Sequence, residues 1–89
     1  MHISVHRDQI RQALRDYLLD EFLVGENPDA LTDKTSLISG GILDSIGVTR
    51  LVTHLEIQYS VLFESDEMTV DNLDTIPLIV SAIEQKLST

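Results

Sequence analysis

The stretch SGGILDSIGVTRL, residues 39–51, places one serine directly after an aspartate, where a helical pattern begins. A serine at such a point can act as a nucleophile, cap the helix or accept a covalent group. A hydrolase nucleophile needs glycine two residues before and two residues after it, because its strained turn crowds any side chain. Gly47 follows Ser45 at that spacing, but Leu43 stands at the preceding position. The nucleophile motif is therefore incomplete.

A general base for Ser45 is also missing from the neighbouring sequence. The nearest downstream histidine is His54. At about 100° and 1.5 Å per residue, a helix would place it on the opposite side, roughly 13 Å along the axis. His2 and His6 belong to another predicted helix. We therefore expect no serine-hydrolase chemistry.

Both residues of the Asp-Ser pair are types that cap helices, but capping does not explain the residues that follow. A helical wheel of residues 45–59 gives one core-facing arc: Val48, Leu51, Val52, Leu55 and Tyr59. Ile46 and Ile57 fall on the far side, with Arg50 between them. An apolar stripe beside an exposed serine is typical of a docking face. The predicted docking face comprises Ile46, Thr49, Arg50, Thr53, Glu56 and Ile57.

The rest of the chain predicts helices that surround this one. Apolar residues recur at three- and four-residue spacing in two further segments. The first set is Ile10, Ala13, Leu14, Tyr17, Leu18 and Phe22, and the second is Ile76, Ile79, Val80, Ile83 and Leu87. The sequence predicts one all-α domain over residues 1–89, a small four-helix bundle with three main helices and a short third helix. The expected elements are helix I at about 4–23, a loop at 24–43, helix II at about 45–59, helix III at about 70–74 and helix IV at about 75–87.

The long loop between the first two helices is uncommon in so small a domain, and loops of that kind are often functional. We expect apolar side chains to hold it against the core: Leu31, Leu37, Ile38 and Leu43. A second loop contains ESDEM, with three carboxylates at Glu64, Asp66 and Glu67. It lacks the glycine and the spacing of a calcium-binding EF-hand loop, so we expect no metal site there.

Composition limits the possible partners. The 15 acidic and 6 basic residues give a net charge of −9, which opposes binding to nucleic acid and favours basic protein surfaces. The absence of cysteine excludes disulfides and thiolate zinc sites, and it fits a cytoplasmic protein. The start, MHISVHRDQI, has no long apolar stretch, and no apolar run approaches the ~20 residues that span a bilayer. We therefore expect neither a signal peptide nor a membrane span.

The segment LDSIGVTRLVTHLE resembles the attachment segment of acyl and peptidyl carrier proteins. In that family an Asp-Ser pair opens the second helix, and 4′-phosphopantetheine from coenzyme A is esterified to the serine. The similarity covers nearly the whole chain, since TVDNLDTIPLIVSAIEQKL is similar to the family's third and fourth helices. The resemblance implies phosphopantetheine on Ser45, recognition through Asp44 by a phosphopantetheinyl transferase, and a carrier that is itself non-catalytic.

Within the family, GGILDSIG is most similar to stand-alone aminoacyl carriers, including D-alanyl carriers. Ile42 stands where fatty-acid carriers usually have glycine, and Arg50 where they commonly have glutamate. The resemblance implies a cytoplasmic, monomeric carrier that is loaded by an adenylating acyl or aminoacyl ligase, or by an acyltransferase, and delivers its thioester to downstream biosynthetic enzymes. Two alternatives remain. One is a fatty-acid or polyketide acyl carrier protein, and the other is a helical adaptor without a prosthetic group, in which Ser45 is only a cap.

Overall fold

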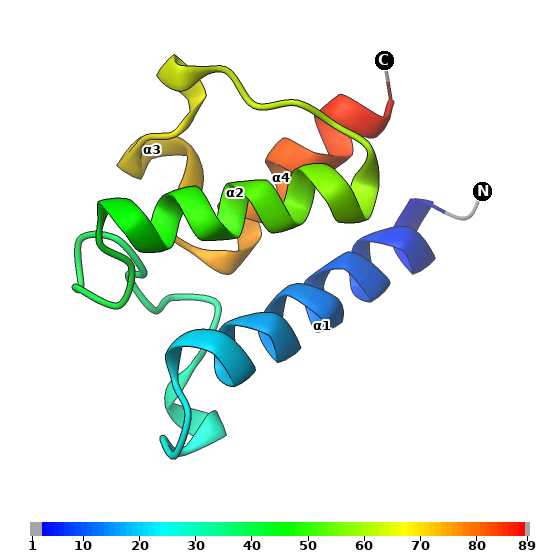
Figure 1. Ribbon diagram of the computed structural model, residues 1–89. Coiled ribbons are helices and arrows are strands. Elements are labelled where there is room, and N and C mark those ends of the chain that lie inside the picture. The colour runs from blue at the N-terminus through cyan, green and yellow to red at the C-terminus, as the bar shows by residue number, and fades with distance from the viewer. Residues whose placement is uncertain (1–2, 89) are drawn as a thin grey trace.

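The computed structural model describes the backbone of residues 3–88 and the side chains of residues 7–88. Residues 3–88 form four α-helices: α1 (Ile3–Phe22), α2 (Ser45–Tyr59), α3 (Val70–Leu73) and α4 (Ile76–Leu87) (Figure 1). Short 3-10 turns at Pro28–Ala30 and Ser65–Glu67 interrupt the two long connections. No strand occurs in residues 3–88, so the all-α prediction is confirmed. The helix limits agree with the predicted ones to within one residue at each end.

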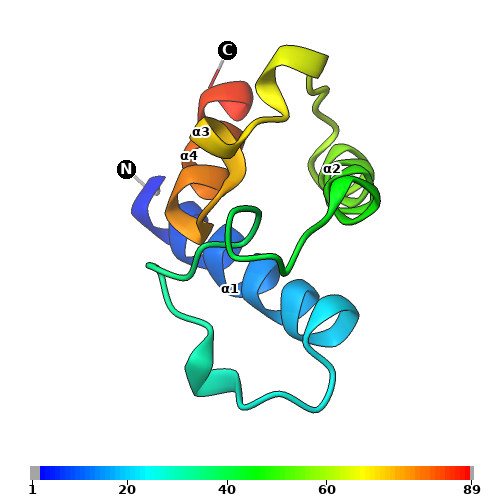
Figure 2. The same cartoon turned by 90° about the vertical axis from the view of Figure 1, so that its left-hand side faces the viewer.

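The helices enclose one core from three sides. The backbones of α1 and α4 lie close together, and α3 packs against α4. The helix α2 lies across the core from α4 and α3, as the two views in Figures 1 and 2 show. It reaches the core through side chains, since Leu51, Val52 and Leu55 are almost fully buried. The outward face of α2 is thereby left to solvent.

The core includes residues from every helix and from both long connections. Its members are Ile10, Leu14, Leu18, Leu31, Leu37, Leu43, Leu51, Val52, Leu55, Val61, Phe63, Leu73, Ile76, Ile79, Val80 and Ile83. The predicted anchors Leu31, Leu37 and Leu43 are at most 2% exposed, which confirms that the first connection is fastened to the core. Ile38, also predicted as an anchor, is only partly buried.

Two residues that the periodicity placed on core faces lie outside the core. Ala13 is exposed, and Leu87 is 48% exposed. Both line a groove, open to solvent, between α1 and the ends of α2 and α4, together with Tyr59. At these positions the neighbouring helices do not close over the apolar side, so the periodic pattern alone overestimated the burial.

Cationic side chains of α1 hold the first connection in place. Arg15 donates to the backbone carbonyls of Leu31 and, at 2.6 Å, of Pro28. Arg11 pairs with Asp33 at 2.8 Å. Since carbonyls of irregular backbone need donors, these arginines stabilise a segment that forms no regular structure of its own.

Candidate functional site

Ser45 is the first residue of α2, and the helix is capped by its predecessor. Asp44 has an extended backbone, and its Oδ1 accepts a hydrogen bond from the amide of Gly47 at 2.7 Å. Its carbonyl also accepts from the amide of Val48 at 2.8 Å. Of the two caps that the sequence left open, the structure therefore selects Asp44. The Ser45 side chain is exposed, and its hydroxyl makes no hydrogen bond to the part of the chain that is described.

Gly47 allows the first turn of α2 to approach α1. A Cβ atom at this position would lie 3.3 Å from Cε1 of Phe22, 3.3 Å from Oδ1 of Asp44 and 3.4 Å from Cδ2 of Leu43. These separations are tighter than ordinary van der Waals contact, so a larger residue would push the turn away. Sequence reasoning considered Gly47 only as part of a nucleophile motif and missed this packing role. A glycine inside a helical pattern was the available signal.

The two glycines before the Asp-Ser pair shape the loop that leads into α2. We call residues 37–43 the site loop. Gly41 has φ +88°, a backbone conformation that favours glycine. A Cβ on Gly40 would lie 2.2 Å from the carbonyl oxygen of Ser36, so any side chain there requires the backbone to move. The amide of Leu43 donates to the carbonyl of Leu37 at 2.8 Å and closes the loop directly before α2 begins.

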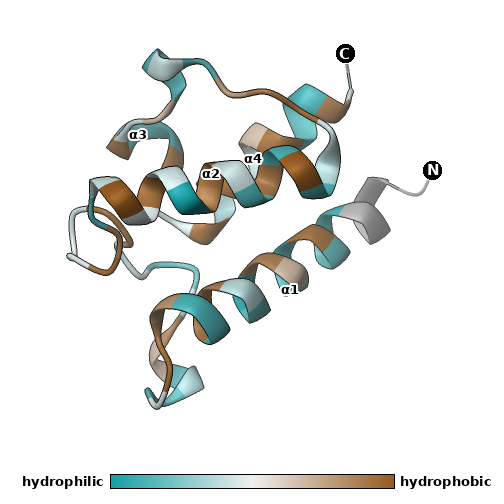
Figure 3. Cartoon of the chain, viewed as in Figure 1, coloured by the Kyte–Doolittle hydropathy of each residue, from teal (hydrophilic) through white to brown (hydrophobic). Residues whose placement is uncertain are grey.

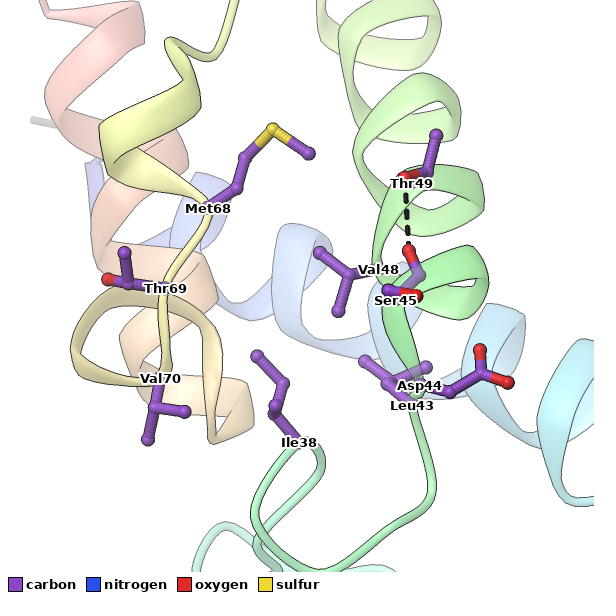
Figure 4. A pocket seen from close by; sticks show the side chains of 9 residues that line it. All are labelled: Ile38, Leu43, Asp44, Ser45, Val48, Thr49, Met68, Thr69 and Val70. Atoms are coloured by element: carbon purple, nitrogen blue, oxygen red, sulfur yellow. Dashed lines mark hydrogen bonds between the residues drawn. The ribbon is translucent and has the colours of Figure 1, made fainter.

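A groove of about 510 Å³ lies beside Ser45. In Figure 4, side chains of α2 form one wall, the segment that leads into α3 forms the other, and Ile38 lies between them. The lining residues are Ile38, Leu43, Asp44, Ser45, Val48, Thr49, Met68, Thr69 and Val70. Most of the side chains that line it are apolar, so an aliphatic chain that begins at Ser45 would find apolar surface next to it.

Five of the six residues of the predicted docking face are exposed, and one of the five, Thr49, also lines the groove beside Ser45. Ile46 and Ile57 are 70% and 77% exposed, and Thr49 and Thr53 are exposed between them. Figure 3 shows apolar bands toward both ends of α2 with hydrophilic bands between them. Glu56 differs from the other members, because it is partly buried and its Oε2 accepts the amide of Phe63 at 2.9 Å. Its carboxylate therefore holds the connection that follows α2.

Arg50 is exposed but is engaged within the molecule. Its Nη2 lies 2.7 Å from Oε1 of Glu21, and its guanidinium carbon lies 5.2 Å from the ring centroid of Phe22. Because both partners of the ion pair are about half exposed, the pair contributes only about 0–1 kcal/mol. A partner carboxylate could therefore replace Glu21 at little cost. Sequence reasoning identified the exposure of Arg50 and missed its link to the end of α1.

His54 is also engaged, on the side of α2 that faces α1. Its ring stacks on that of Tyr17, with centroids 3.8 Å apart and an interplanar angle of 7°. The Tyr17 hydroxyl donates to the carbonyl of Arg50 at 3.4 Å. Burial, with a smaller contribution from Glu21, raises the pKa of Tyr17. The pair fastens α2 to α1.

The acidic loop before α3 is organised by internal contacts. Glu67 accepts the amide of Glu64 at 2.7 Å and both its oxygens lie 2.9 Å from Nζ of Lys86. The hydrogen bond from the Glu64 amide is the main cause that lowers the pKa of Glu67, and the hydrogen bond from Lys86 is the next.

Among the described residues there is no group of three or more ligand side chains that could hold a metal ion. No helix in residues 3–88 is both long and apolar enough to cross a membrane.

Comparison with known proteins adds no assignment, since no protein-family model matches the chain and no curated protein is significantly similar to it. What Ser45 does is therefore inferred from the residues around it.

Proposed function

We propose that this protein is a carrier that holds an acyl or aminoacyl group as a thioester on 4′-phosphopantetheine attached to Ser45. The observation that carries this proposal is that capping of α2 and exposure of a hydroxyl fall to two different residues at the start of the helix. Asp44 caps the helix, and the Ser45 hydroxyl is left exposed and without a hydrogen bond to the described residues. A group esterified to that oxygen would cost the helix no cap.

The residues at the start of α2 fit a phosphodiester. The first amides of a helix have no acceptor within the helix, and together with the helix dipole they favour a bound phosphate. Asp44 uses Oδ1 for the cap and remains exposed, so its carboxylate is available to basic or metal-bearing groups of a phosphopantetheinyl transferase. The group would supply a thiol for the thioester, in a chain that has no cysteine of its own.

The groove beside Ser45 supports the same proposal. Val48 lies beside Ser45, and Ile38 and Val70 present apolar side chains elsewhere in the same groove (Figure 4). An arm esterified to Ser45 could rest on this surface between deliveries. The rigid helix α2 would hold the attachment oxygen in a fixed position for partner enzymes, as transfer between active sites requires.

We further propose that the partners are an aminoacyl- or acyl-adenylating ligase and downstream biosynthetic enzymes. The outward face of α2 offers Ile46 and Ile57 as apolar contacts and Arg50 as its one cation. The one carboxylate of the predicted docking face, Glu56, is bonded to the Phe63 amide. Partners built for a strongly acidic helix would gain little here, whereas an apolar surface with one acidic group is complementary. The apolar groove is the observation that favours the second candidate, a fatty-acid or polyketide carrier.

Intact-mass measurement tests the attachment. The protein is incubated with coenzyme A and a broad-specificity phosphopantetheinyl transferase. We expect a mass gain of one phosphopantetheine, with Ser45→Ala unmodified. Modification at another serine, or none with several transferases, would favour the adaptor without a prosthetic group.

Loading of the modified protein then tests whether it is an aminoacyl carrier or a fatty-acid or polyketide carrier. The modified protein is offered to a panel of amino-acid adenylating ligases and to a malonyl transferase. We expect thioester formation with an amino acid. Efficient malonyl loading with every amino acid accepted poorly would leave the carrier function standing and make it a fatty-acid or polyketide carrier.

A further inference from the structure

Asp74 joins two parts of the chain that are distant in sequence. It follows α3, directly before the cap of α4, and its Oδ1 accepts the amides of Ile38 at 2.8 Å and Ser39 at 2.9 Å. Its Oδ2 accepts the Ser39 hydroxyl at 2.7 Å, and its backbone carbonyl accepts the amide of Leu37 at 2.6 Å. Four hydrogen bonds therefore run from three consecutive residues of the site loop to one residue.

These bonds reach the surroundings of Ser45 by two routes. The first is Ile38, whose backbone is held by Asp74 and whose side chain lies in the groove beside Ser45 (Figure 4). The second is the backbone of the site loop. The carbonyl of Leu37 accepts a hydrogen bond from the amide of Leu43, and Leu43 directly precedes the Asp44 cap. Leu37 and Leu43 are buried, so a shift at one end of the loop is passed to the other end.

We propose that Asp74 is a positioning residue for Ser45, because its carboxylate fixes the site loop and the site loop sets both the groove wall and the entry into α2. This inference rests on the proposed carrier function. A carboxylate suits the task, since one side chain must accept three hydrogen bonds from neighbouring donors. Alanine would remove all three, whereas asparagine would replace one acceptor oxygen by a donor group.

The test compares Asp74→Ala with two matched controls. Thr75→Ala removes the cap bond from the Leu78 amide in the next residue along, so it lowers stability without touching the site loop. Asp71→Asn removes one exposed carboxylate of α3 that accepts no hydrogen bond from the described residues. For Asp74→Ala we expect kcat for phosphopantetheine transfer to fall roughly tenfold with little change in KM, because misplacement of a reacting group slows the step more than it weakens docking. Both controls should be modified at about the wild-type rate.

Amide spectra by nuclear magnetic resonance give a readout that is independent of transfer. Asp74→Ala should shift the signals of Ser45 and Ile46 as well as those of the site loop, and Thr75→Ala should leave Ser45 unchanged. Should Asp74→Ala fail to fold, Asp74→Asn and Ser39→Ala remove fewer bonds and should give smaller changes in the same direction.

The outcomes separate the two proposals. A wild-type protein that is never modified ends the carrier function, while the spectra still decide whether Asp74 controls the start of α2. A folded Asp74 variant with unaltered Ser45 signals and a wild-type transfer rate would overturn the inference and leave the carrier function intact.

Discussion

The Asp44 carboxylate lies 2.7 Å from the amide nitrogen of Gly47, and this bond caps α2 without the help of Ser45. Replacement of Asp44 by alanine should therefore lower the free energy of unfolding by about 0.5–2 kcal/mol, as loss of a side-chain cap does. Ser45→Ala should stay within about 0.5 kcal/mol of the wild type, because it removes only an exposed hydroxyl that has no hydrogen-bond partner in the described part of the chain. Urea unfolding followed by circular dichroism measures both. Equal destabilisation by the two variants would show that the hydroxyl is part of the cap.

The contact between Gly40 and Ser36 gives a second prediction. A Cβ at Gly40 would lie 2.2 Å from a backbone carbonyl oxygen, so Gly40→Ala must displace the site loop. We expect a loss of about 1–3 kcal/mol in the free energy of unfolding together with slower modification of Ser45. Gly25→Ala is the control, because Gly25 has φ +82° but open space around it and lies outside the site loop. It should lower stability through backbone strain alone and leave the modification rate unchanged. Slower modification in both variants would mean that the rate follows general stability and not the shape of the site loop.

Two carboxylates give the stability an acid dependence of known sign. The backbone hydrogen bond from Ser39 is the main cause that lowers the pKa of Asp74 below its ordinary value of 3.8. The amide of Glu64, followed by Lys86, lowers the pKa of Glu67 below its ordinary value of 4.5. The unfolded chain then binds more protons than the folded chain in acid. The stabilisation is complete above the ordinary values and is lost as the pH falls through the folded values.

Urea unfolding at a series of pH values between about 2.5 and 6.5 measures this dependence. Asp74→Asn should flatten the acid part of the stability curve, because asparagine does not titrate. Asp71→Asn is the matched change, three residues earlier at an exposed carboxylate of α3. An equal flattening in both variants would contradict the assignment to the hydrogen-bonded carboxylate.

The helices were predictable from the sequence because their apolar residues repeat with the period of a helix, and the Asp-Ser pair marked the start of α2. The choice between Asp44 and Ser45 as cap was not predictable, since both residue types can accept the same amide hydrogen bond. The role of Asp74 was hidden for a different reason. Its partners Ile38 and Ser39 lie 36 and 35 residues earlier, and a polar side chain in a turn leaves no periodic pattern.

The predicted docking face shows the limit of a helical wheel most clearly. The wheel placed Arg50 on the outward stripe, and Glu56 was included in the predicted face as its one carboxylate. The structure adds their partners: the Phe63 amide reaches Glu56 from the following connection, and Glu21 reaches Arg50 from α1. Such contacts depend on where other segments of the chain lie in the folded protein, and the local sequence does not encode this. The isoleucines were placed correctly because their exposure needs no partner.

The last prediction concerns this outward face. Ile57 and Val24 are both 77% exposed, but Val24 follows α1 and Ile57 lies on α2 about 18 Å along the axis from Ser45. If partner enzymes dock along α2, Ile57→Asp should weaken docking by about 1–3 kcal/mol, because it would bury a charge where an apolar side chain packs against the partner. The loss should appear as a higher KM in the loading of the modified protein by an amino-acid ligase, with kcat nearly unchanged. Val24→Asp adds the same charge to an equally exposed position and should load normally. If the two variants have equal KM values, α2 is not part of the docking surface. The proposal that Ser45 is the attachment site would be unaffected.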